Sequence, residues 1–70
     1  MKYAIIDQTA TDWFEEVFDS EKEAVESADT EWKRMSEHDK NRREAFFVAS
    51  CEVEDGGVLF ETLEMVRRYK

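Results

Sequence analysis

The side chains that could do chemistry are few and scattered along these 70 residues. The chain holds one histidine, His38, and one cysteine, Cys51. A nucleophilic cysteine needs a base that activates it, and a zinc site needs several ligands at defined spacing, so this pair predicts neither. His38 lies among charged residues and is interpreted as a surface residue. Cys51 alternates with apolar residues and is interpreted as part of the core.

Glu15 and Glu16 resemble the paired carboxylates of an acid–base site. In a strand, however, neighbouring side chains point to opposite faces, so these two carboxylates cannot share one proton. Gly56 and Gly57 lack the flanking residues of a phosphate-binding loop. We therefore expect no enzyme activity, no cofactor and no metal site.

Negative charge is the main remaining signal. The chain has 18 acidic and 10 basic residues, a net charge of −8, and residues 1–31 hold ten of the acids against two lysines. An acidic surface attracts basic proteins and repels nucleic acid. The candidate partner-binding residues are Asp12, Glu15, Glu16, Asp19, Glu23 and Glu26. As an alternative, such carboxylates can imitate DNA phosphates and inhibit a host DNA-binding or defence protein.

One basic cluster follows the acidic segment. Its members are Lys33, Arg34, Lys40, Arg42 and Arg43. These side chains could contact phosphates, but the negative charge around them and the absence of a nucleic-acid-binding motif favour a solvated loop. We therefore expect no direct binding to nucleic acid.

The bulk properties indicate a single domain over residues 1–70. The composition is 41% hydrophobic with clear periodicity, which excludes a disordered acidic tail. No apolar run reaches the roughly 18 residues of a membrane span, and the N-terminus lacks a signal-peptide pattern. A lone thiol suits a reducing compartment, so we expect a cytoplasmic protein with no membrane partner.

The strongest local pattern is a helix over residues 20–35. Ser20 and Glu23 form a capping-box pattern, and apolar residues then recur at helical spacing up to Trp32 and Met35. Aromatic and β-branched residues predict strands over 3–7, 13–18 and 45–53, with a turn at Asp55-Gly56-Gly57. Thr62 is expected to cap a short C-terminal helix that presents Leu63, Val66 and Tyr69.

These elements predict an α+β fold in β-β-α-β order. A right-handed crossover places the third strand beside the first, which gives a three-stranded antiparallel sheet with strand order 2-1-3. The long helix is expected to pack on one face of the sheet, followed by the short C-terminal helix.

The strands are apolar on both faces, so the face without the long helix also needs a cover. The cover could be the C-terminal helix, a second copy of the chain, or a partner protein. We favour the C-terminal helix over a second copy, so the chain is expected to be a monomer or a homodimer. In a homodimer, Phe14, Phe46 and Val48 would form the self-interface.

The chain resembles a group of small proteins in the segments KYAIID, WFEEVFDS-EKEA, ADTEWKRMSEHDKNRREAFFVA and CEVEDGG. These segments are similar to small uncharacterised acidic proteins of anaerobic Gram-positive bacteria, some of them encoded on conjugative mobile elements. The resemblance implies a compact α+β fold, a bacterial cytoplasmic setting and an accessory role to a mobile element. We therefore predict a non-catalytic protein-interaction module of unknown specific function, which binds an unidentified and basic protein partner.

Overall fold

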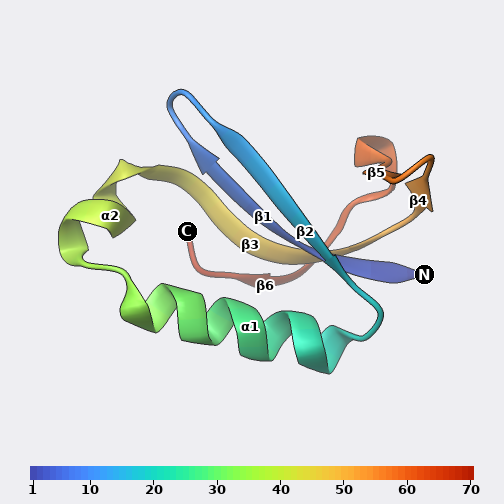
Figure 1. The fold of residues 1–70 in the computed structure, drawn as a ribbon, viewed down its shortest axis with the longest axis horizontal. Helices are drawn as coiled ribbons and strands as arrows, with labels where there is room; N and C mark the ends of the chain where they lie inside the picture. The colour runs from blue at the N-terminus through green and yellow to red at the C-terminus, as the bar shows by residue number, and fades with distance from the viewer.

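Four antiparallel strands form the main sheet, in the order β2-β1-β3-β6 (Figure 1). The computed structural model describes all residues, Met1–Lys70. The elements in chain order are β1 (Lys2–Thr9), β2 (Trp13–Phe18), α1 (Glu21–Arg34), α2 (Glu37–Arg42), β3 (Arg43–Cys51), β4 (Val53–Glu54), β5 (Gly57–Val58), the 3-10 turn η1 (Phe60–Thr62) and β6 (Glu64–Arg68). β4 and β5 form a separate two-stranded hairpin at the end of the molecule opposite α2 (Figure 1).

Two serines start the two helices. The Ser20 hydroxyl oxygen accepts a hydrogen bond from the Glu23 backbone N–H at 3.2 Å, and the Ser36 hydroxyl does the same for Asp39 at 3.1 Å. These bonds satisfy helix N–H groups that have no partner within the helix. The break between α1 and α2 follows from the second cap, because Met35 and Ser36 both adopt extended backbone angles. The chain therefore turns here and enters β3 after one further turn of helix.

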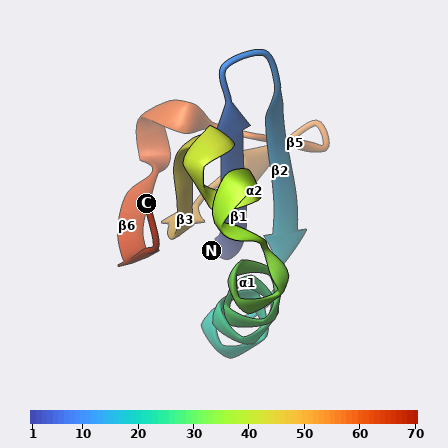
Figure 2. The ribbon, with the colours of Figure 1, turned by 90° about the vertical axis from the view of Figure 1, so that its left-hand side faces the viewer.

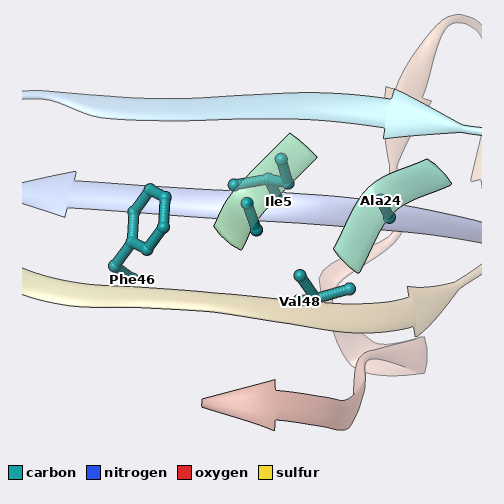
Figure 3. Close-up of a cluster of buried hydrophobic side chains, with 5 residues drawn as sticks. Ile5, Ala24, Phe46 and Val48 are labelled. Carbon is teal, nitrogen blue, oxygen red and sulfur yellow. The ribbon is translucent and has the colours of Figure 1, made fainter. Parts of the chain in front are cut away.

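Helix α1 covers one face of the sheet and buries the larger part of the core there. Ala24 and Ala28 of the helix pack on Ile5, Phe46 and Val48 of the central strands (Figure 3). The two alanines are small, so the helix backbone can approach the sheet closely. Phe46 fills the space beside them, stacked on Trp32 with a centroid distance of 5.4 Å and in edge contact with Tyr69 at 5.6 Å.

The prediction of a three-stranded sheet with a short C-terminal helix was wrong. The last residues form a fourth strand, β6, which pairs with the outer edge of β3. The three-residue spacing of Leu63, Val66 and Tyr69, which suggested a helix, instead spans the end of a 3-10 turn and a bulged strand. Val66 is the extra residue at the bulge, between the pairs Ala49–Met65 and Val48–Arg67. A short isolated helix would leave the β3 edge unpaired, whereas β6 satisfies it.

Thr62 also has a different role from the predicted helix cap. Its hydroxyl accepts a hydrogen bond from the Glu52 backbone N–H at 2.9 Å and donates one to the Leu59 carbonyl at 2.6 Å. These bonds fasten the η1 turn to the residue that follows β3. Thr62 therefore holds the turn from which the chain enters β6.

The second face of the sheet is covered by the segment between β3 and β6, not by a helix. Val58 and Leu63 from this segment pack against Ala4, Ile6 and Cys51. The expectation that a C-terminal helix covers this face was therefore also wrong. The suggested self-interface of Phe14, Phe46 and Val48 is excluded too, because Phe46 and Val48 are fully buried beneath α1.

Tyr69 gives the fold a defined pH dependence. Its hydroxyl donates a hydrogen bond to the Asp29 carboxylate. Burial, and then this bond, raise the pKa of Tyr69 from 10.0 to about 12. A raised pKa means that the neutral tyrosine stabilises the folded chain fully below about pH 10, where the unfolded chain would begin to ionise. This contribution is lost as the pH rises towards the folded value.

We expect a Tyr69→Phe chain to be less stable than the wild type at pH 8 and to lose less stability between pH 10 and 12. Urea unfolding at several pH values in this range measures both effects. Tyr3 is present in both chains and serves as the internal control. Equal losses in the two chains over this range would contradict the assignment to Tyr69.

Candidate partner-binding edge

β2 lies at one edge of the main sheet and pairs only with β1 (Figure 2). The pairing runs without a shift from Tyr3–Phe18 to Gln8–Trp13. The outward side of β2 therefore presents a row of backbone N–H and C=O groups that have no partner in the chain. We call the strand with this free side the β2 edge (Trp13–Phe18).

The β2 edge is unusually apolar for an exposed strand. Phe14 is 61% exposed, Trp13 43% and Val17 40%. Phe14 lies on the face covered by α1, whereas Trp13 and Val17 lie on the opposite face, as their β1 partners do. Large exposed side chains gathered on one element are typical of interaction sites.

The six acidic residues of the predicted site fall into three places. Glu15 and Glu16 are on the β2 edge, Asp12 and Asp19 are at its two ends, and Glu23 and Glu26 are on the exposed side of α1. Glu15 and Glu16 point to opposite faces of the sheet, since their β1 partners are Ile6 and Ile5. The structure therefore places four of the six along β2 and its ends, and the other two on α1.

Several of these carboxylates already have partners. Asp19 forms an ion pair with Lys2, and this hydrogen bond holds the pKa of the Asp19 carboxyl below its usual value. Glu23 accepts a hydrogen bond from the Ser20 hydroxyl at 3.1 Å. Glu15 accepts one from the Trp13 indole N–H at 3.3 Å. Asp12, Glu15 and Glu16 form no ion pair within the chain.

Glu31 belongs to the same acidic region, although it was not among the predicted partner-binding residues. Burial raises the pKa of the Glu31 carboxyl, and the charges of Asp7 and Glu16 raise it further, whereas Arg43 acts against them. The carboxylates of β2 and of α1 therefore approach one another on the helix-covered face. Glu31 is nonetheless exposed to solvent, and its neighbours become apparent only from the way α1 crosses the sheet.

The predicted basic cluster is divided in the fold. Arg43 is largely shielded from solvent, and its guanidinium binds Asp7 with Nε–Oδ1 at 3.0 Å. Lys33 instead meets two residues from the other end of the chain, Arg67 and Arg68, around a hollow that Asp29 and Tyr69 also line. Lys33 thus lies on the β6 side of the molecule, whereas Arg43 is held against β1.

A second shallow hollow lies beside the β2 edge, between Trp13 and Phe60. The two rings meet edge to face, with a centroid distance of 5.3 Å. Phe60 comes from η1, which is far from Trp13 in sequence, so residue patterns could not have paired them. This contact adds an apolar surface to the face that Glu15 shares.

Cys51 is almost completely buried in the second core cluster. Burial raises the pKa of the Cys51 thiol, and the charges of Glu15 and Glu52 raise it further. His38 is exposed on α2, and no group of three His, Cys, Asp or Glu side chains is placed to hold a metal ion.

We expect Cys51 to react with a thiol reagent at pH 8 at least about 100-fold more slowly in the folded chain than in urea, because the reagent needs the chain to open. Spectrophotometric titration with an aromatic disulfide measures both rates. Equal rates would contradict the burial of the thiol.

No family model, curated protein or solved structure matches this chain. The similarity to small acidic proteins of anaerobic Gram-positive bacteria therefore stays a prediction. None of the helices has the length and apolar character needed to span a bilayer.

Proposed function

We propose that this chain is a non-catalytic interaction module that binds a basic protein partner through the β2 edge. The observation that carries the proposal is the combination found on this strand. Phe14, Trp13 and Val17 are at least 40% exposed, and the backbone on the outward side is unpaired. Apolar anchors supply most of the binding free energy at protein interfaces, and aromatic residues are enriched among them.

The charge of the same strand supports a basic partner. Glu15 and Glu16 lie between the apolar anchors and form no ion pair within the chain. Asp12, which also forms no ion pair within the chain, extends the negative charge beyond the first end of the strand. Complementary charge speeds association and discriminates against acidic partners, while the apolar contacts hold the complex together.

The alternative, an acidic imitation of DNA, finds less support. A mimic needs carboxylates distributed over the surface that enters a DNA-binding groove. Here Glu15 and Glu16 point to opposite faces, and large apolar side chains stand beside each of them. Such side chains suit a protein partner better than a groove shaped for phosphates. An accessory role on a mobile element is compatible with this function and belongs to the same proposal.

Capture from an extract of the producing cells tests the proposal. The baits are the wild-type chain, a Phe14→Ser chain and a Met65→Ser control. Met65 is 56% exposed but lies on β6 at the other edge of the sheet, so both substitutions remove an exposed apolar side chain. We expect the wild type and the control to capture the same basic protein in equal amounts. The Phe14→Ser chain should capture at least about tenfold less of it.

The charge contribution is tested with a Glu15→Gln/Glu16→Gln bait. We expect weaker capture of the same protein and a smaller effect of salt on it. The proposal fails if no protein is captured in a manner that depends on Phe14, or if Phe14→Ser and Met65→Ser reduce capture equally.

A further inference from the structure

We propose that the partner adds a strand to the sheet, antiparallel to β2, and that Glu15 and Glu16 select a basic strand while they exclude a second copy of this chain. This inference rests on the proposed function and specifies its binding mode. Strand addition uses the backbone of an exposed sheet edge for affinity and the alternating side chains for specificity.

The β2 edge has the regularity that strand addition needs. Its pairing with β1 has no bulge, whereas the β1–β3 and β3–β6 pairings each contain one. Sheet edges are commonly protected by proline, lysine or a bulge. β2 has none of these, and Glu15 and Glu16 are its only charged residues.

Two copies of the chain could pair through β2 in only a few registers. In a symmetric antiparallel pair, opposite residues share a face, so the two longest registers contain five pairs each. One register centres on Glu15 opposite Glu15 of the second copy, and the other centres on Glu16 opposite Glu16. Like charges directly opposite one another destabilise a strand pair. The registers in which no glutamate lies opposite a glutamate contain only three residue pairs.

The same geometry defines the chemistry of the occupant. On one face, the complementary residues of the added strand are apolar opposite Trp13, basic opposite Glu15 and apolar opposite Val17. On the other face, Phe14, Glu16 and Phe18 call for the same order. The occupant is therefore an extended segment with adjacent lysine or arginine residues, flanked on both sides by apolar residues.

A charge-swapped copy of this chain is a probe that needs no knowledge of the natural partner. In a Glu15→Lys/Glu16→Lys chain, either five-pair register with wild-type β2 sets a lysine opposite a glutamate. Both positions are exposed, so the fold should be retained, which circular dichroism checks. A Glu52→Lys/Glu54→Lys chain has the same net charge, and its substitutions lie at exposed positions near β4.

We expect the equimolar mixture of wild type and the Glu15→Lys/Glu16→Lys chain to associate at least about tenfold more tightly than either chain alone, as measured by sedimentation equilibrium up to about 1 mM. The mixture of wild type and the Glu52→Lys/Glu54→Lys chain should stay monomeric. Nuclear Overhauser contacts between isotopically labelled wild-type β2 and the unlabelled partner should connect opposite strands across the interface.

Three results would overturn the inference. They are the absence of association in the charge-swapped mixture, association without contacts between the two β2 strands, and self-association of the wild type through β2. These outcomes are separate from the capture experiment. Capture that depends on Phe14 without strand pairing would leave the proposed function standing, whereas strand pairing without such capture would remove the function and keep the binding mode of the edge.

Discussion

Replacing Phe46 with alanine is expected to destabilise the chain by about 3–5 kcal/mol, the usual cost of truncating a fully buried phenylalanine. Phe46 is completely buried and contacts both Trp32 and Tyr69 through its ring. Its loss therefore opens a cavity where α1, β3 and the C-terminal segment meet. A chain of this length has about 4–10 kcal/mol of stability in total, so this single substitution removes a large share of it.

Urea unfolding followed by tryptophan fluorescence measures the change. Phe60→Ala provides the matched control, because Phe60 is 50% exposed and its loss should cost less than about 1 kcal/mol. If Phe46→Ala cost no more than Phe60→Ala, the packing of α1 on β3 would be contradicted.

Removing the Arg43 guanidinium is expected to cost about 2 kcal/mol. Arg43 binds Asp7 through two nitrogen–oxygen contacts of 3.0 and 3.4 Å and also donates to the Asp39 carbonyl at 3.3 Å. The side chains of Arg43 and Asp7 are only 20% and 15% exposed. An Arg43→Met chain therefore leaves the poorly solvated Asp7 carboxylate without its partner. The expected cost lies between that of a surface ion pair and that of a fully buried one.

A double-mutant cycle separates the pair from its surroundings. We expect Asp7→Asn and Arg43→Met each to destabilise the chain and the double variant to cost clearly less than their sum. Additive effects would mean that the two side chains act independently. Lys2→Met, which removes an exposed partner of Asp19, serves as the control and should change stability far less than Arg43→Met does.

The local elements could be predicted from sequence because local physics determines them. The Ser20 cap, the apolar face of α1 and the aromatic pattern of β2 and β3 all concern residues within one turn or one strand of each other. β6 was missed for the opposite reason. Val66 and Tyr69 are spaced as in a helix, and only the unpaired edge of β3, distant in sequence, selects a strand with a bulge.

The candidate site was predictable in composition but not in arrangement. Strand alternation correctly separated Glu15 from Glu16, and the register with β1 confirms it. Three contacts depend on how segments distant in sequence meet across the sheet. They are the approach of Glu31 to Glu16, the contact of Trp13 with Phe60, and the ion pair of Arg43 with Asp7. Charge counts along the chain contain no information on such crossings.

Amide hydrogen exchange of the isolated chain tests the central claim, which is that β2 presents an open edge for another protein to complete. In an edge strand, alternate N–H groups point away from the sheet and lack a partner. We predict fast exchange at alternate residues of Trp13–Phe18, while the amides of β1 and β3 exchange slowest. Slow exchange along the whole of β2 would contradict the account, because the edge would then already be paired.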